Sequence, residues 1–184
     1  MGIELSMVTR PPRAVLFDRD GTLVRDVPYN GDPARVEPMP TARAATALLR
    51  RHGIAIGVIT NQSGVARGLL SQADVAAVNE RVEELLGPFD VWAVCPHGAD
   101  EGCGCRKPAP GLVIAALRAL GLRPADAVVI GDIGSDVDAA RAAGSEAVLV
   151  PTPLTRGDEV RDAPLVAATV LAAVELVLAR ERAS

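Results

Sequence analysis

The sequence predicts an α/β fold of the Rossmann-like type, a three-layer α/β/α sandwich with a central parallel sheet of about five strands. Short strands that are apolar on both faces alternate with segments of helical periodicity, the pattern of a parallel sheet covered by helices on both sides. Of the 184 residues, 49% are hydrophobic and only 2% aromatic, so aliphatic side chains must build the core. This length suits one domain over residues 1–184.

The predicted strands are short aliphatic runs that end in glycine or in polar turn residues. Valine, isoleucine and leucine favour extended structure, and runs this short do not make a buried helix. In chain order, the strands are expected at residues 14–17, 54–60, 90–95, 127–131 and 147–150.

The predicted helices have apolar residues three and four positions apart, which places these residues on one face. They are expected at residues 41–52, 71–86, 111–120, 136–143 and 165–182. Gly53 ends the first helix, and His52 is expected to cap its last carbonyl groups. Ser71 begins the second helix, with Asp74 in the capping-box position three residues later.

Three segments lack such periodicity. Residues 1–12 contain two adjacent prolines and are expected to form a loose leader, while residues 24–40, rich in proline, glycine and charge, are expected to form a loop beside the site. Residues 151–163 are expected to be a turn-rich segment, to which we assign no function. No insertion is long enough for a cap domain, so the fold is expected to be capless.

The charge balance limits the classes of partner. With 19 basic and 23 acidic residues, the net charge is −4, which gives no general attraction to nucleic acid or to an anionic membrane. No secretory signal and no apolar run of about 20 residues is present in the sequence. We therefore expect a cytoplasmic protein whose substrate is a small molecule. The sequence leaves the oligomeric state open, and a monomer is compatible with it.

Two carboxylates follow the first predicted strand. Asp18 and Asp20 lie one residue apart in the run Asp18-Arg19-Asp20-Gly21-Thr22, and strand alternation places them on the same side. One carboxylate can attack a phosphate while the other protonates the leaving oxygen, provided that a divalent cation screens the two anions. A solvated aspartate-rich turn is the alternative reading of this motif.

Three further polar groups follow later strands, at the edge of the sheet where parallel α/β folds bind ligands. Thr60 and the residues up to Gly64 follow the second strand, Arg106 and Lys107 lie beyond the third, and Asp132 follows the fourth. Any one of these groups would pass for an ordinary turn. Their common position at one edge predicts an active site there.

A cysteine-rich segment precedes Lys107. Cys95, His97, Cys103 and Cys105 include every cysteine of the chain and one of its two histidines. Three thiolates and one imidazole make a closed tetrahedral set for a structural Zn²⁺ ion, which predicts a zinc-binding loop over residues 95–105. Free buried cysteines or a disulfide are the alternatives, and the odd number of cysteines argues against a disulfide. A zinc ion there would hold Lys107 in register with a phosphate.

These motifs resemble those of the haloacid-dehalogenase superfamily, over the chain from about residue 14 to residue 150. The zinc loop resembles that of its histidinol-phosphatase-like branch, whose members lack a cap. The resemblance implies that Asp18 is the nucleophile and forms an aspartyl-phosphate, and that Asp20 is the general acid and later the base. It also implies that Thr60 holds the phosphoryl oxygens and that Lys107 neutralises charge on nucleophile and phosphate.

The resemblance further implies a catalytic Mg²⁺ ion. Asp18, the main-chain carbonyl of Asp20 and Asp132 would hold it, an oxygen-only set that suits magnesium. Asp136 is either a fourth residue of this metal site or a capping and orienting residue at the start of the following helix.

Within the branch, residues 60–68 are closely similar to the sugar-bisphosphate phosphatases, so a small phosphorylated sugar is the expected substrate. The residues expected to bind it are Asp26, Tyr29, Asn61, Gln62, Ser63, Arg67 and Arg106. The chain departs from that pattern at Val24, at Ile133 and in the shorter zinc loop, which leaves the sugar and its anomer open.

Three alternatives remain to the sugar bisphosphate. Histidinol phosphate or another amino-alcohol phosphate would call for carboxylates and aromatic residues around the substrate. A polynucleotide 3'-phosphatase would need a basic groove with aromatic residues, whereas this chain is acidic and has one tryptophan and one tyrosine. An inactive, zinc-stabilised binding module is disfavoured because all the motif residues are present.

Overall fold

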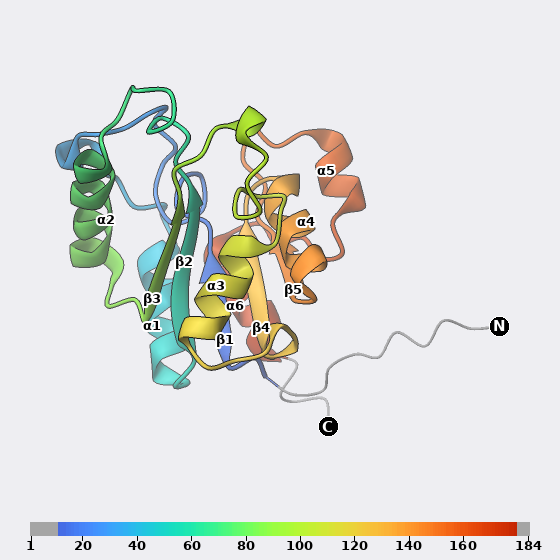
Figure 1. The fold of residues 1–184 in the computed structure, drawn as a ribbon. Coiled ribbons are helices and arrows are strands. Elements are labelled where there is room, and N and C mark those ends of the chain that lie inside the picture. The colour runs from blue at the N-terminus through green and yellow to red at the C-terminus, as the bar shows by residue number, and fades with distance from the viewer. Residues whose placement is uncertain (1–10, 180–184) are drawn as a thin grey trace.

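The computed structural model describes residues 11–179, which fold around one parallel sheet of five strands in the order β3-β2-β1-β4-β5 (Figure 1). The leader predicted over residues 1–12 therefore lies almost entirely outside the described residues. The strands are β1 (Ala14–Phe17), β2 (Ala55–Asn61), β3 (Val91–Cys95), β4 (Ala127–Gly131) and β5 (Glu146–Leu149).

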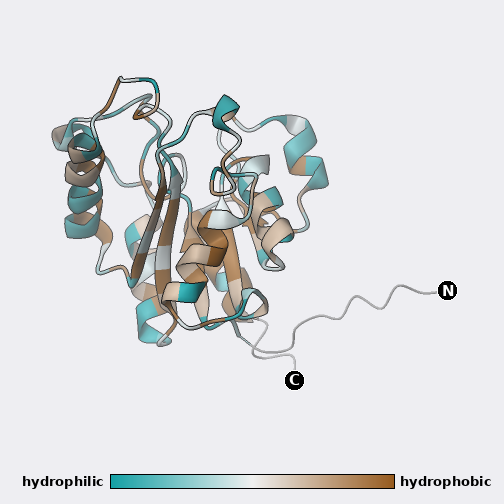
Figure 2. Ribbon diagram, viewed as in Figure 1, coloured by the Kyte–Doolittle hydropathy of each residue, from teal (hydrophilic) through white to brown (hydrophobic). Residues whose placement is uncertain are grey.

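Helices cover both faces of this sheet, as the three-layer prediction requires. On one face, α1 (Ala42–Arg51), α2 (Gln72–Leu86) and α6 (Val170–Ala179) pack over alternate strand residues such as Val15 and Phe17. On the other face, α3 (Gly111–Ala119) and α4 (Gly134–Ala143) pack over Ala14 and Leu16. The hydrophobic residues are concentrated in the strands between these layers (Figure 2).

Capping residues fix several helix ends. The Ser71 side chain accepts from the Asp74 backbone N–H at 3.1 Å, and the Asp74 carboxylate accepts from the Ser71 backbone N–H at 2.8 Å, which confirms the predicted capping box. The His52 ring lies 3.0 Å from the Leu48 carbonyl oxygen, as expected for a residue that caps the end of α1.

Three boundaries differ from the sequence prediction. The segment 151–163, predicted to be only turn-rich, contains the short helix α5 (Gly157–Asp162), which lies beside α4. The last helix begins at Val170 instead of residue 165, because Val166 forms a parallel bridge with Leu149 at the edge of the sheet. Helix α4 begins at residue 134, two residues earlier than predicted, and residues 180–182 of the last predicted helix lie outside the described residues.

The strand order places the ligand-binding edge. From β1 the chain moves outward through β2 and β3, and it then returns to the other side of β1 for β4 and β5. This reversal of chain order opens a crevice at the carboxyl ends of β1, β2 and β4. Within residues 11–179, no helix is long and apolar enough to cross a membrane.

Candidate functional site

A pocket of about 330 Å³ lies at the carboxyl edge of the sheet. The loop 24–40 contributes to its wall, as predicted, through residues 26–30. The predicted site residues that line the pocket are Asp18, Asp20, Asp26, Tyr29, Thr60, Asn61, Gln62, Ser63, Lys107 and Asp132. The strand order therefore brings together residues from four separate segments of the chain.

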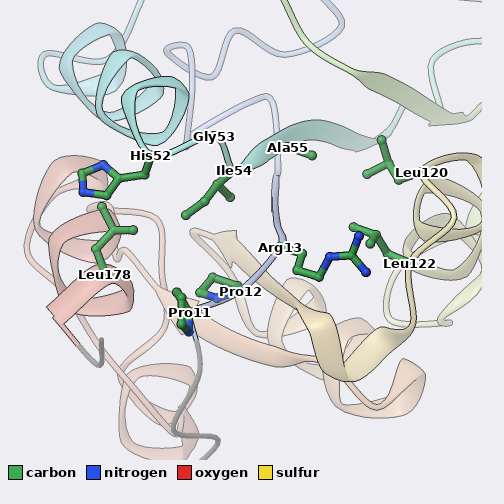
Figure 3. Close-up of a pocket in the computed structure, with 10 residues that line it drawn as sticks. All are labelled: Pro11, Pro12, Arg13, His52, Gly53, Ile54, Ala55, Leu120, Leu122 and Leu178. Carbon is green, nitrogen blue, oxygen red and sulfur yellow. The ribbon is translucent and has the colours of Figure 1, made fainter. Parts of the chain in front are cut away.

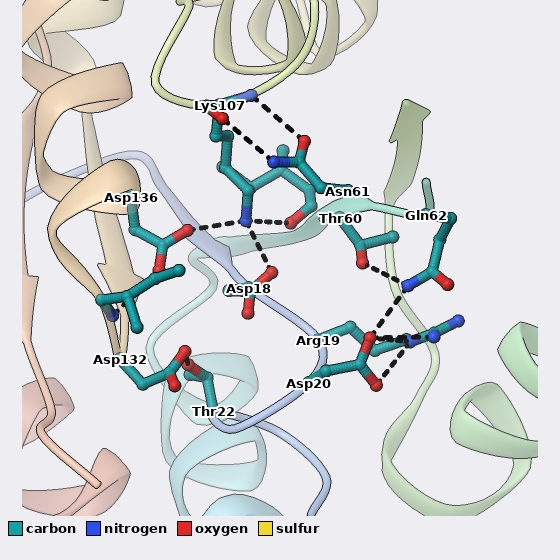
Figure 4. A network of polar contacts seen from close by, with 12 residues as sticks. Asp18, Arg19, Asp20, Thr22, Thr60, Asn61, Gln62, Lys107, Asp132 and Asp136 are labelled. Atoms are coloured by element: carbon teal, nitrogen blue, oxygen red, sulfur yellow. Dashed lines mark hydrogen bonds and ion pairs between the residues drawn. The ribbon is translucent and has the colours of Figure 1, made fainter. Parts of the chain in front are cut away.

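Lys107 lies at the centre of the polar network in Figure 4. Its Nζ atom lies 2.6 Å from Asp18 Oδ1, 2.6 Å from Asp136 Oδ1 and 3.1 Å from the Ile59 carbonyl oxygen. The Lys107 side chain is only 3% exposed. An ammonium group buried to this degree has to be paired, and here two carboxylates and a carbonyl satisfy its three donors.

Burial and the charges of neighbouring groups together set the acid–base properties of this network. It raises the pKa of Asp18 well above the ordinary value, against the opposing charge of Lys107. Burial acts to lower the pKa of Lys107, but the charges of Asp136 and Asp18 outweigh it and raise that pKa. Burial and the charge of Asp136 raise the pKa of Asp132 to about 7. One ammonium thus faces more carboxylates than it can balance, an arrangement that a bound cation would relieve.

Three carboxylates offer oxygen atoms to such a cation. Asp18, Asp132 and Asp136 can each supply an oxygen so that all three lie within 4.8 Å of one another. However, Asp136 Oδ1 is paired with Lys107, and its Oδ2 accepts from the Ile133 backbone N–H at 3.3 Å. The structure therefore favours the orienting role among the two predicted for Asp136, and it leaves Asp18 and Asp132 as the side chains of this group that could hold a cation.

Asp132 is held from both sides. Thr22 Oγ1 donates to Asp132 Oδ1 at 3.3 Å, and Thr155 Oγ1 donates to the Asp132 carbonyl oxygen at 2.6 Å. Gly21 has a φ of +85°, and a Cβ atom at this position would lie 2.3 Å from Asp132 Oδ2. A glycine is therefore required at this turn, both for its backbone conformation and for the space that the carboxylate occupies.

Asp20 has different surroundings, since its side chain is 26% exposed and faces the pocket. Arg19 Nη2 donates to Asp20 Oδ2 at 2.9 Å, and Gln62 Nε2 donates to the same oxygen at 2.8 Å. Gln62 Nε2 also lies 2.9 Å from Thr60 Oγ1, so these residues form a connected row along the pocket (Figure 4).

Asn61 joins two of the predicted motifs. Its side-chain Nδ2 donates to the Lys107 carbonyl oxygen, and its Oδ1 accepts from the Lys107 backbone N–H, both at 3.1 Å. The predicted substrate-binding residue Asn61 thus clamps the backbone of Lys107 to the end of β2.

The remaining predicted substrate residues occupy different positions. Tyr29, at a φ of +50° and 45% exposed, forms part of the rim, with the Arg67 guanidinium 5.7 Å from its ring centre. Burial and the charge of Asp20 raise the pKa of Asp26. Arg106 does not line the pocket, and its Nη1 instead donates to the His97 carbonyl oxygen at 3.4 Å.

The cysteines and His97 gather in one cluster beside this site. The Cys105 sulfur lies 3.2 Å from the Cys95 sulfur and 3.6 Å from the Cys103 sulfur, and His97 Nδ1 lies 3.2 Å from the Cys105 sulfur. A tetrahedral zinc site with bonds of about 2.3 Å has sulfur–sulfur edges of about 3.8 Å, close to this spacing. The cluster is compatible with a metal site, and no disulfide is present among the three cysteines.

A second pocket, of about 360 Å³, lies at the opposite edge of the sheet (Figure 3). His52, Arg13 and Pro12 line it together with aliphatic residues such as Ile54 and Leu178. It contains no cluster of carboxylates or thiols, and the two groups of candidate metal ligands among the described residues lie outside it.

Comparisons with known proteins agree with this geometry. A family model described as HAD-hydrolase-like matches residues 104–175. A D-glycero-beta-D-manno-heptose-1,7-bisphosphate 7-phosphatase of Pseudomonas aeruginosa is 36% identical over 143 residues, which cover 75% of this chain and 80% of that protein. The chain belongs to the haloacid-dehalogenase superfamily. This confirms the resemblance predicted from the four motifs.

Two other proteins that are similar to this chain are also named as heptose bisphosphate phosphatases. A D-glycero-alpha-D-manno-heptose-1,7-bisphosphate 7-phosphatase of Mycobacterium bovis is 38% identical over 133 residues, covering 68% of this chain and 70% of that protein. The crystal structure of a D,D-heptose 1,7-bisphosphate phosphatase from B. bronchiseptica, complexed with magnesium and phosphate, superposes with a TM-score of 0.81 at 31% identity, covering 90% of this chain and 98% of that one. The predicted fold is confirmed.

Several residues of the site are not predictable from the sequence pattern. Arg19 lies between the two motif aspartates, and strand alternation alone would have pointed it away from them. Asn79, which Arg19 contacts, lies on α2, and Thr155 and Leu154 lie in the segment to which no function was assigned. Arg19 could have been noticed because it lies inside the motif of residues 18–22. Nothing in the sequence distinguishes Asn79, Leu154 or Thr155 from ordinary surface residues.

Proposed function

We propose that this protein is a phosphomonoester hydrolase that depends on a divalent cation and acts through an aspartyl-phosphate on Asp18. One observation carries the proposal: Asp18 contacts the buried Lys107 at 2.6 Å, and a second carboxylate, that of Asp20, lines the same pocket. Asp132 completes a set of oxygen ligands beside Asp18. Attack, leaving-group protonation and charge screening each have a residue in place.

The chemistry assigns one role to each residue. An Asp18 carboxylate oxygen attacks phosphorus, the bond from phosphorus to the ester oxygen breaks, and Asp20 gives that oxygen its proton. Water then attacks the phosphorus of the aspartyl-phosphate while Asp20 takes up the proton, which releases inorganic phosphate and restores Asp18. Lys107 and the Thr60 hydroxyl are the groups that would face the phosphoryl oxygens.

Magnesium is the cation that best suits the donor set. The carboxylates of Asp18 and Asp132 and the main-chain carbonyl of Asp20 would hold it, since Mg²⁺ prefers oxygen ligands and retains waters. When bound, this ion would offset the repulsion between the Asp18 carboxylate and an anionic substrate. The bound magnesium in the B. bronchiseptica relative supports this assignment.

We further propose that the substrate is D-glycero-D-manno-heptose 1,7-bisphosphate and that the 7-phosphate is removed. The names of the relatives support this substrate, and relatives of both anomeric preferences are similar to this chain, so the anomer is the point to determine. Tyr29 lines the pocket, and the Arg67 guanidinium lies 5.7 Å from its ring centre, so we propose that Arg67 binds a sugar hydroxyl or a second phosphate at the rim.

The cysteine cluster is proposed to hold one structural Zn²⁺ ion. Its four protein ligands would leave no open position for a substrate, so the ion would stabilise the loop that leads into Lys107. Zinc–thiolate ligation requires reduced cysteines, which supports the expected cytoplasmic location.

A turnover screen with Mg²⁺ tests the substrate. Both anomers of the heptose bisphosphate, histidinol phosphate and an oligonucleotide 3'-phosphate are compared by kcat/KM. We expect one heptose anomer to be preferred. A higher kcat/KM for histidinol phosphate or the oligonucleotide would replace the proposed substrate and leave the phosphatase chemistry intact.

Asp18→Asn tests the chemistry. The variant conserves volume but lacks the attacking charge, so we expect turnover to be abolished while the melting temperature stays within a few degrees of the wild type. Acid-quenched wild-type protein is expected to carry phosphate on the peptide that contains Asp18. Near-normal activity of Asp18→Asn would disprove covalent catalysis at this residue.

A further inference from the structure

Arg19 is a buried charge that the proposed chemistry does not use. Only 1% of the residue is exposed, and it is the largest of the fully buried side chains. A buried guanidinium is strongly destabilising unless its donors are paired. The partners of Arg19 therefore indicate what this residue does.

The Arg19 guanidinium binds two side chains. Its Nε atom lies 3.2 Å from both Asp20 oxygens and its Nη2 atom 2.9 Å from Asp20 Oδ2, so that the planar fork grips one carboxylate. Its Nη1 atom donates to Asn79 Oδ1 at 2.6 Å. Asn79 lies on α2, outside the pocket, so this contact ties the guanidinium to a rigid helix.

Asp20 needs such support because of its position. The Asp18 backbone N–H still donates to the Ile130 carbonyl oxygen of β4 at 2.9 Å, whereas Asp20 lies further beyond the end of β1 and forms only an isolated bridge to Val24, which belongs to no strand of the sheet. Gln62 holds one carboxylate oxygen from the pocket side at 2.8 Å, and Arg19 holds the carboxylate by its fork. Without Arg19, Gln62 alone would fix the direction of the Asp20 side chain.

We propose that Arg19 is a positioning residue, anchored by Asn79, that aims the Asp20 carboxylate at the leaving oxygen of the substrate. This inference rests on the proposed phosphatase function. It adds a residue of α2 to the set that determines catalysis, although α2 contributes no side chain to the pocket.

Asn79 allows a test that leaves the pocket lining unchanged. Asn79→Ala removes the anchor, whereas Asn79→Asp keeps an acceptor oxygen and serves as the matched conservative variant. A general acid contributes about 10²–10⁴-fold, mainly with poor leaving groups. We therefore expect Asn79→Ala to lower kcat for an alkyl phosphate such as glycerol phosphate by roughly ten-fold, with KM unchanged.

Leaving-group dependence separates positioning from general loss of structure. p-Nitrophenyl phosphate needs little protonation of its leaving oxygen, so its kcat is expected to change by less than about three-fold in Asn79→Ala. Asn79→Asp is expected to restore turnover of the alkyl phosphate. Equal losses on both substrates, or no loss on either, would overturn the inference.

Crystal structures of the two variants give a readout that does not depend on activity. We expect the Arg19–Asp20 fork to be displaced in Asn79→Ala and retained in Asn79→Asp. A fork that is unchanged in Asn79→Ala would show that Asn79 is no anchor. If wild-type protein with Mg²⁺ hydrolyses neither these phosphates nor a heptose bisphosphate, the proposed function fails, while these structures still decide whether Asn79 positions Arg19 and Asp20.

Discussion

Asp18 and Asp20 are separated by one residue in the sequence and differ sharply in their surroundings. Asp18 is 7% exposed and pairs with a buried lysine, whereas the more exposed Asp20 carboxylate accepts from a guanidinium and an amide. Two carboxylates in unlike environments can divide the roles of nucleophile and proton donor. The identities of these residues are visible in the sequence, but their difference in burial is a product of the fold.

Asp136 supports Lys107 and can be tested by a single-atom change. Asp136→Asn keeps the volume but removes the charge that pairs with Lys107 at 2.6 Å. Loss of this charged hydrogen bond is expected to lower the free energy of unfolding by roughly 1.5–3 kcal/mol. Chemical denaturation measures the change.

Asp138→Asn is the matched control on the same helix. Its partner is the exposed Arg141, at 3.1 Å, and exposed pairs of this kind contribute less than about 1 kcal/mol. Similar losses in both variants would show that the buried pair is not a special support for Lys107.

Asp132 gives the metal-free protein a characteristic pH dependence. Its pKa of about 7 in the folded protein lies above the ordinary 3.8. The folded state therefore holds a proton that the unfolded chain has released, and stability from this group is present below about pH 4 and lost as pH rises through about 7. We expect the melting temperature in magnesium-free buffer to fall as pH rises over this interval.

Asp132→Asn and added Mg²⁺ complete this test. The variant has no proton to release at this position, so its melting temperature is expected to fall less over the same pH interval. Mg²⁺ competes with protons for the Asp132 carboxylate and is expected to stabilise the wild type more at neutral than at acidic pH. Identical pH profiles of variant and wild type would contradict the assignment.

At the scale of elements, the turn between β5 and α5 supports the metal position. Thr155 Oγ1 donates to the Asp132 carbonyl oxygen at 2.6 Å and accepts from the Thr152 backbone N–H at 2.8 Å. Leu154, 73% exposed, lies between these threonines and lines the pocket. The turn-rich segment 151–163, to which no function was assigned from the sequence, thus contributes Leu154 to the pocket and Thr155 to the support of Asp132.

Thr155→Val tests this contact, because valine has the same shape without the hydroxyl group. We expect Mg²⁺ affinity, measured by titration calorimetry, to fall several-fold. Loss of a residue that holds a ligand side chain typically lowers metal affinity by about 10- to 100-fold, and Thr155 holds only the backbone of Asp132. Thr155→Ser retains the hydroxyl and is expected to bind Mg²⁺ like the wild type. Unchanged affinity in Thr155→Val would leave Thr155 with a purely structural role.

The sequence pattern predicted the strands and the first three helices well and the two C-terminal helices poorly. All five strands were predicted within one residue of their ends, because each is an aliphatic run bounded by turn residues. Helix α5 has six residues and no buried side chain, so its sequence has no periodic pattern of apolar residues that would predict a helix. Leu165 and Val166 look like the start of an apolar helix, but a bridge to Leu149 at the sheet edge decides their conformation. Sequence periodicity does not predict such a long-range contact.

At the scale of the whole molecule, the strand order explains why four motifs in separate segments meet. The contacts that connect them are less predictable, since those of Arg19 with Asn79 and of Thr155 with Asp132 join residues 60 and 23 positions apart. Residue types at strand ends indicate the chemistry. The pairing of side chains across the crevice depends on packing that only the folded chain defines.

The cysteine cluster is expected to link metal content to the stability of the molecule. Protein purified without added zinc is expected to contain about one zinc ion per chain after dialysis against magnesium-free buffer. Cys103→Ser is expected to lose this zinc and to lower both the melting temperature and, through Lys107, the activity. Elemental analysis and thermal denaturation measure the two effects.

Asp100→Ser is the control in the same loop, because Asp100 is exposed and is not part of the cluster. It is expected to keep its metal. Zinc loss from Cys103→Ser with unchanged kinetics would separate the metal from the position of Lys107, while a wild-type protein without zinc would refute the metal assignment itself.

The clamp that Asn61 places on Lys107 has a consequence for how this fold can change. A side-chain amide presents the same donor and acceptor as a peptide group. The Asn61 side chain therefore pairs with the backbone of Lys107 as a neighbouring strand would, although Lys107 belongs to no strand. Lys107 is thereby fixed from the β2 side as well as by the cysteine cluster that precedes it. Length changes between His97 and Cys103 that preserve the cluster are therefore expected to leave the lysine in place, provided that position 61 keeps a carboxamide.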